Sequence, residues 1–185
     1  VSLGGAKAVP PRGFDPLVPV VHRLPFNCER HELEDLFDRA AAPDSIAAFV
    51  VEAIQGEGGY RLARPEFISL LQEACEEHGI LLMVDEVQTG IGRTGELFGW
   101  QYYGIRPDIF TLAKALGNGF PVSACLALPE AAAAFEVGDH GGTYGGNPTA
   151  CAAAIAVLTA IHEEQILDNV RGVGPHIRER LEELS

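Results

Sequence analysis

The chain has 185 residues, of which 47% are hydrophobic, and its formal net charge at pH 7 is −13. This length and composition predict one domain, or slightly more, with a sizeable core. The strongly acidic balance argues against nucleic acids and anionic membrane surfaces as the main partners. The longest run of small and apolar residues, 150–161, is too short to span a bilayer and predicts a buried or half-buried helix.

Cysteines stand at positions 28, 75, 125 and 151, and six histidines are scattered along the chain. Neither residue type recurs with the spacing typical of a metal site or a disulfide framework. We therefore expect reduced, mostly buried thiols, no metal site and a cytoplasmic protein. The chain begins with valine and ends in a helical pattern, so we expect it to be a piece of a longer protein, whose N-terminus would hide any targeting segment.

The N-terminal part of the chain predicts irregular structure followed by one helix and one strand. Residues 1–27 are rich in proline and glycine and predict a connection, with a short strand at 17–24. Residues 30–41 have helical apolar spacing. Residues 46–54 form a nearly continuous apolar run, which is typical of a strand buried on both faces of a parallel sheet. Residues 55–63 predict a loop.

The middle of the chain alternates between helix and strand patterns. A helix is predicted from Pro65 to Gly79, with proline in its first turn and glycine just past its end. Strands are predicted within 80–86, 107–114 and 122–128. This alternation predicts an α/β fold with a parallel, doubly wound sheet.

Glycine marks the C-terminal part of the chain. The segment 140–147 predicts a glycine-rich loop, and Pro148 predicts the start of a long helix. A further amphipathic helix is predicted after Gly172 and Gly174.

Residues 90–95 read GIGRTG, which fits the G-x-G-x-x-G pattern of dinucleotide-binding loops. In such folds the first glycine follows the strand almost directly, and a helix begins after the third. Here the residues after Gly95 are aromatic and interrupted by Gly99 and Gly104, which is a poor start for a helix. The pattern therefore favours a tight loop that needs positive φ angles, and NAD-dependent chemistry stays only as an alternative.

Asp85 stands at the end of the second predicted strand, where open α/β sheets bind ligands. Burying a carboxylate there is costly unless a cation or strong donors face it. One candidate cation is the protonated ring nitrogen of pyridoxal 5'-phosphate (PLP), which needs an acidic partner. The other is a nearby arginine such as Arg93, and the residues alone leave both interpretations open.

Lysine is rare in this chain, with only Lys7 and Lys114 among thirteen basic residues. Lys114 follows the strand-like PDIFTLA and precedes a glycine-bearing loop. A lysine at a strand end can reach a crevice at the sheet edge and hold an aldehyde as a Schiff base. The alternative is an ordinary solvated lysine, which the apolar flanking residues disfavour.

The segment 84–121, VDEVQTGIGRTGELFGWQYYGIRPDIFTLAKALGNGFP, resembles the core of the class III PLP-dependent aminotransferases that act on acetylornithine, ornithine or 4-aminobutyrate. EAIQGEGG upstream and HGGTYGGNP downstream also match, and the resemblance runs from Pro16 to the end. It implies the large domain of the type I PLP-transferase fold, incomplete here, with a mostly parallel central sheet and helices on both faces. Residues 1–170 would belong to this domain, and 171–185 would be a helix leading toward a C-terminal small domain.

The resemblance also implies roles for individual residues. Asp85 would pair with the ring nitrogen of PLP, and Gln88 would hydrogen-bond the ring hydroxyl. Lys114 would bind the cofactor aldehyde and then move the proton between the substrate and the cofactor.

Three further residues acquire roles only through the resemblance. Thr143 would donate to the cofactor phosphate of a neighbouring subunit, which implies a homodimer with a shared active site. Glu52 would lie near the ring. Glu57 would pair with a substrate-gating arginine.

The implied reaction moves an amino group from a small-molecule ω-amino donor to a 2-oxo acid, 2-oxoglutarate. N-acetylornithine is the favoured donor, which would mean arginine biosynthesis, and ornithine or 4-aminobutyrate come next. Ala53 and Gly142 stand where the family usually has proline and Ser or Thr. The family's upstream phosphate loop, ring-stacking aromatic residue and substrate arginine have no counterpart in the chain, so we expect the 185 residues alone to be inactive. An aminomutase and a non-catalytic domain remain as alternatives.

Overall fold

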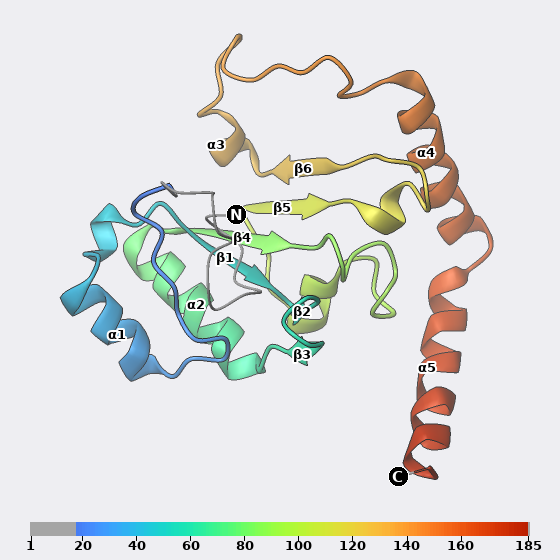
Figure 1. Ribbon diagram of the computed structural model, residues 1–185, viewed down its shortest axis with the longest axis horizontal. Helices are drawn as coiled ribbons and strands as arrows, with labels where there is room; N and C mark the ends of the chain where they lie inside the picture. The colour runs from blue at the N-terminus through green and yellow to red at the C-terminus, as the bar shows by residue number, and fades with distance from the viewer. Residues whose placement is uncertain (1–17, 185) are drawn as a thin grey trace, which may run out of the picture. The chain divides into compact units, whose positions relative to one another are not determined.

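The computed structural model of the protein describes residues 18–184. The chain forms two compact units, Val1–Phe49 with Ile54–Ile80, and Val50–Ala53 with Leu81–Ser185 (Figure 1). Lys7 lies outside the described residues.

The first unit begins with helix α1, Arg30–Arg39, which confirms the helix predicted at 30–41. The backbone N–H of Glu29 donates to the Glu32 carboxylate at 2.8 Å, which satisfies one donor at the helix start. The short 3-10 helix η1, Pro43–Ser45, follows α1.

Helix α2, Pro65–His78, has the ends that its proline and glycine predict. Pro65 occupies the first turn, where its missing N–H costs nothing. Gly79 closes the helix with φ of 69°, a left-handed conformation that glycine adopts without strain, and its N–H donates to the Cys75 carbonyl. The apolar face of α2 is buried and comprises Phe67, Ile68, Leu70, Leu71, Ala74 and Cys75.

Two expectations for this unit were wrong. The predicted loop 55–63 contains part of a small antiparallel hairpin, β2 Ile54–Gln55 and β3 Arg61–Leu62, because the glycine-rich turn between them lets the chain reverse. The strand predicted at 17–24 is not formed over the described residues 18–24. Pro19 offers no amide there, and Val20 has a positive φ of 62°, so a strand ladder cannot run through them.

A four-stranded sheet has the strand order β1-β4-β5-β6, from β1 Ala48–Glu52, β4 Leu81–Asp85, β5 Ile109–Leu112 and β6 Ala124–Ala127. β4 and β5 pair in parallel, as predicted. β6 pairs antiparallel to β5, so the sheet is mixed, in agreement with the mostly parallel sheet that the resemblance implied (Figure 1). The reason is the short connection, which carries only the 3-10 helix η3, Lys114–Leu116, and cannot return the chain to the start of β5.

The strand β1 also differs in burial from its prediction. Phe49 and Val51 are buried, but Val50 is 50% exposed, so burial alternates along the strand instead of covering both faces.

Helix α4, Pro148–Glu163, starts at the predicted proline. The Asn147 side chain caps it by accepting the N–H of Ala150 at 3.0 Å. One stripe of α4 packs against a core of Ile91, Leu112 and Leu116, and its members are Ala154, Val157 and Ile161. Most of the helix is nevertheless exposed, which corrects the expectation of a buried or half-buried helix. Its apolar residues occupy every face, and only one face has a partner in the described chain.

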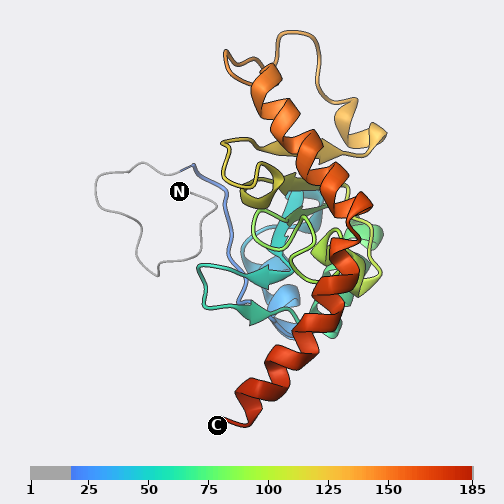
Figure 2. The ribbon, with the colours of Figure 1, turned by 90° about the vertical axis from the view of Figure 1, so that its right-hand side faces the viewer.

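Helix α5, Ile166–Glu182, starts earlier than predicted and runs through Gly172, Gly174 and Pro175. It is therefore continuous across the predicted domain boundary between 170 and 171. Helix α5 follows α4 after a bend of 70°. Figure 2 shows the two helices, in orange and red, one after the other. Within residues 18–184, no single helix has the length and apolarity to cross a membrane; α4 and α5 meet those criteria only as a bent pair.

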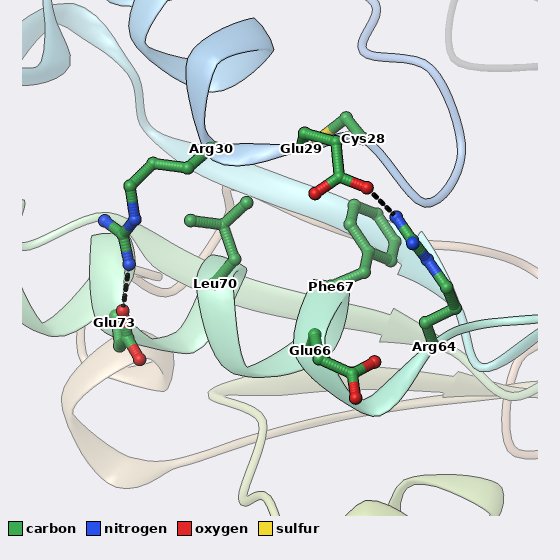
Figure 3. Close-up of a pocket in the computed structure, with 8 residues that line it drawn as sticks. All are labelled: Cys28, Glu29, Arg30, Arg64, Glu66, Phe67, Leu70 and Glu73. Carbon is green, nitrogen blue, oxygen red and sulfur yellow. Dashed lines mark hydrogen bonds and ion pairs between the residues drawn. The ribbon is translucent and has the colours of Figure 1, made fainter.

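None of the four cysteines forms a disulfide, but only Cys28 and Cys75 are buried, so the expectation of mostly buried thiols holds for two of them. Cys28 lines a hollow of about 220 Å³ in the first unit, with residues from the starts of α1 and α2. In Figure 3 two ion pairs border this hollow, Arg64 with Glu29 and Arg30 with Glu73. Burial raises the pKa of the Cys28 thiol from 9.0 to about 11, and the negative charges of Glu32 and Glu29 contribute less to the same increase.

This raised pKa predicts slow alkylation of Cys28. At pH 9 an unfolded Cys28 is about half thiolate, whereas the folded thiol should be roughly one-hundredth thiolate. Iodoacetamide should therefore modify Cys28 at least about tenfold more slowly in the native chain than in urea, as measured by peptide mass mapping. Equal rates in both states would contradict the assignment. As pH rises, the thiol loses its proton at a lower pH in the unfolded chain than in the folded one. The contribution of Cys28 to the free energy of unfolding is therefore complete below pH 9 and declines as pH rises toward 11.

Candidate active site

The GIGRTG segment forms a tight loop after β4, as its glycines predict. Gly92 and Gly95 have φ angles of 84° and 91°, and Ile91 between them and the strand has φ of 58°. The element that follows is a 3-10 helix, η2 Gly99–Tyr103, and not the α-helix that a dinucleotide loop requires. The loop geometry therefore gives no support to the NAD alternative.

The Asp85 side chain lies at the carboxyl end of β4 and is half-buried. Its Oδ1 accepts the N–H of Val87 at 2.9 Å and the hydroxyl of Thr111 at 3.3 Å. Among the described residues no ion pair joins Asp85 to Arg93, the arginine considered as its partner. Two donors on one oxygen fix the carboxylate and leave its other oxygen available to a cation.

Lys114 lies just beyond β5 and contacts the loop after β4. Its Nζ donates to the Gln88 side-chain carbonyl. The backbone of Lys114 has φ of 42°, a left-handed conformation that costs a residue with a side chain about 1–2 kcal/mol. Such strain concentrates at functional sites, where the surrounding structure holds it in place.

The parallel pairing of β4 and β5 brings these residues to one edge of the sheet. In the pairing of β4 with β5, Asp85 is directly opposite Thr111. Lys114 follows Thr111 in the chain, just after the end of β5. Gln88 and Lys114 are hydrogen-bonded to each other, and Asp85 is held at the same edge by its bonds to Val87 and Thr111.

A cavity of about 830 Å³ opens beside Lys114. This volume is within the range of small-molecule sites. Its lining includes Arg93, the loop Asn118–Ser123 and the glycine-rich loop Tyr144–Asn147, whereas Asp85 and Gln88 do not line it. Thr143 precedes this lining segment directly and is itself exposed.

The remaining predicted residues are less closely tied to this group. Glu52 is the last residue of β1, the strand next to β4, and is half-buried. Glu57 is exposed in the turn between β2 and β3 of the first unit. The roles expected for Thr143, Glu52 and Glu57 stay predictions.

Sequence reasoning missed two residues, Glu86 and Thr111. Glu86, the residue after Asp85, is only 1% exposed, and no role of its own was predicted for it from the sequence. Adjacent residues of a strand point to opposite faces, so a second carboxylate beside Asp85 could have been expected to turn into the protein. Thr111 could have been found only from the strand register, which a single sequence does not reveal.

Comparison with known proteins gives matches along nearly the whole chain. The family model for class-III aminotransferases matches residues 1–185. Acetylornithine aminotransferases from Caldanaerobacter subterraneus and Gloeobacter violaceus are 47% and 52% identical to it, over 94% and 89% of the chain. The chain spans only 42% and 39% of the length of these two relatives.

Solved structures also match the chain over most of its length. The ornithine aminotransferase of Toxoplasma gondii, whose crystal structure has partial occupancy of PLP, superposes with a TM-score of 0.84 at 35% identity. This match covers 92% of the chain and 39% of that protein. The acetylornithine aminotransferase of Elizabethkingia anophelis gives 0.81 at 40% identity, covering 88% and 40%. These matches confirm the predicted α/β fold of the PLP-dependent transferases.

The strand-end aspartate, the strained lysine and the glycine loops thus occur in a chain whose whole length matches one family model, and the chain belongs to the class-III aminotransferases.

Proposed function

We propose that the full-length protein carrying this sequence is a PLP-dependent transaminase that transfers an amino group from an ω-amino donor to 2-oxoglutarate. One observation carries the proposal. Asp85, held by Thr111 and Val87, and Lys114, held by Gln88, lie on the ends of two paired parallel strands. A fixed acid and an amine at one sheet edge are what PLP chemistry requires of a protein.

The residues present fit PLP. Asp85 has an oxygen available for the ring nitrogen, because its two donors both bind Oδ1. The cavity of about 830 Å³ beside Lys114 has the volume for a small-molecule substrate, and Asp85 and Gln88 lie outside its lining. Gln88 would bind the ring hydroxyl, Glu52 would lie near the ring, and Thr143 would bind the phosphate of a neighbouring subunit in a homodimer. When bound, PLP supplies the electron sink that makes the carbon beside the substrate nitrogen acidic.

The chain's own groups then position and move protons. The Asp85 carboxylate holds a proton on the ring nitrogen, because a fixed negative charge beside it favours the cationic form. The Lys114 amine accepts the proton from the substrate carbon and returns it at a second position. Gln88 holds the Lys114 amine at the loop after β4, which limits the positions that the amine can reach.

The proposed donor is N-acetylornithine, which is supported by the names of the relatives at 47% and 52% identity. Ornithine and 4-aminobutyrate come next, and Glu57 is proposed to pair with a gating arginine so that one site accepts both the donor and 2-oxoglutarate. We propose a cytoplasmic location, which the free cysteines support.

Covalent labelling tests the role of Lys114. Incubating the full-length protein with PLP, reducing with borohydride and mapping peptides by mass should give modification mainly at Lys114. Lys7 in the same digest is the internal control, because no role in the site is proposed for it, and Lys114→Arg should remove the main modified peptide. Equal modification of Lys7 and Lys114 would contradict a dedicated site.

Replacing the acid tests the role of Asp85. Asp85→Asn keeps the shape but removes the charge that holds the ring proton, so kcat/KM should fall by about 10²–10³-fold, as for loss of one strong electrostatic contact at an active site. The matched control is Asp38→Asn, a change at an exposed residue of α1, which should leave kcat/KM within about twofold. Comparable activity of Asp85→Asn and the native protein in steady-state assays would refute the assignment.

Donor competition tests the substrate. With 2-oxoglutarate as acceptor, kcat/KM should be highest for N-acetylornithine, lower for ornithine and lowest for 4-aminobutyrate. The 185-residue chain alone is the comparison, and we expect no sustained turnover from it. A preference for 4-aminobutyrate would overturn the choice of donor while leaving the transaminase proposal intact.

A further inference from the structure

The side chain of Glu86 is the largest among the fully buried ones, with 1% of its surface exposed. A carboxylate removed from water is strongly destabilising unless hydrogen-bond donors replace the water. In the described part of the chain no lysine, arginine or histidine forms an ion pair with it. The charge is therefore satisfied by neutral donors alone.

Three donors surround the Glu86 carboxylate, each at 2.8 Å. Oε2 accepts the hydroxyl of Thr89 and the backbone N–H of Gly99, and Oε1 accepts the backbone N–H of Trp100. Thr89 is itself 2% exposed and Gly99 is buried, so two of the three donors are shielded from water, and Trp100 is half-buried. Hydrogen bonds to a charged acceptor in such a setting are short and strong.

The hydrogen bonds to Glu86 require that residue 99 lies close to Thr89 and Glu86. A Cβ at position 99 would lie 2.9 Å from the Cβ of Thr89 and 3.2 Å from Oε1 of Glu86, so only glycine brings its N–H to the carboxylate there. The side chain of Glu86 thus closes residues 86–100 into a loop that contains Gln88 and GIGRTG.

The backbone of Glu86 is hydrogen-bonded through both its N–H and its carbonyl. Its N–H donates to the carbonyl of Thr111 at 3.0 Å, and its carbonyl accepts the N–H of Gly90 at 2.9 Å. Thr111 is also the residue whose hydroxyl binds Asp85. Glu86 therefore connects β5, the start of the loop and the end of the loop at the position immediately after Asp85.

We propose that Glu86 is a positioning residue of the transaminase site. The Glu86 carboxylate closes the 86–100 loop by binding both of its ends. This fixes the positions of Asp85, before Glu86, and Gln88, after it, relative to Lys114. Adjacent residues at the strand end face opposite ways, so one carboxylate serves the site and the other holds the backbone that presents it. The inference rests on the proposed function for its catalytic consequence, but not for the closure of the loop.

Glu86→Gln tests the proposal because it keeps the size and replaces one acceptor oxygen by an NH₂ group that faces donors. At least one of Thr89, Gly99 and Trp100 then loses its acceptor. Hydrogen exchange of the full-length protein without PLP should show faster exchange in peptides covering 86–100, with α2 unchanged. This readout does not depend on the cofactor. Unchanged exchange in 86–100 would overturn the proposal.

The consequence for the site is measured by PLP affinity and by the yield of borohydride-trapped Lys114. Both should fall by about tenfold or more in Glu86→Gln, the factor expected for losing one hydrogen bond to a buried charged group. The matched control is Leu71→Ala, a core change in α2 at a residue with 3% exposure, which should lower the thermal midpoint without altering either readout. This separates positioning from general destabilisation.

The outcomes are distinct. Native-like PLP affinity in Glu86→Gln, or an equal loss in Leu71→Ala, would show that Glu86 does not position the site. If the native protein itself binds no PLP, the proposed function fails, and hydrogen exchange alone decides whether Glu86 closes the loop.

Discussion

The parallel pairing of β4 with β5 is the constraint on which the candidate site depends. Its register sets Asp85 opposite Thr111, so the carboxylate receives its hydroxyl donor from the neighbouring strand. The same pairing makes both strands end at one edge, and the chain leaving β5 reaches Lys114 there. A shift of one residue in this register would place another residue of β5 opposite Asp85 and remove its hydroxyl partner.

The two neighbouring carboxylates at the end of β4, Asp85 and Glu86, have different roles. Asp85 is half-buried and has two donors on one oxygen, which leaves the other oxygen for a ligand. Glu86 is 1% exposed and has donors on both oxygens, so a ligand does not reach it and it serves the protein itself. The difference between a binding group and a structural group thus follows from the direction of each side chain, which the pleat of the strand sets.

Local signals in the sequence predicted local features of the structure well. Pro65 and Gly79 marked both ends of α2, and the scarcity of lysine drew attention to Lys114. Non-local features were missed. The direction of β6 depends on how a short connection returns to the sheet, and the burial of Glu86 depends on amides thirteen and fourteen residues away.

Helix α5 begins at Ile166 and continues through Gly172, Gly174 and Pro175, although the sequence predicted a helix only after the two glycines. Arg171 of α5 binds the carboxylate of Glu96 in the loop after β4 at 3.2 Å. A Cβ on Gly92 would lie 2.9 Å from the side chain of Leu167 in the same helix. Gly92 also has φ of 84°, so a side chain there would be strained even beside a smaller residue at 167. Position 92 should therefore remain glycine through evolution, whereas the flexible end of Leu167 can change.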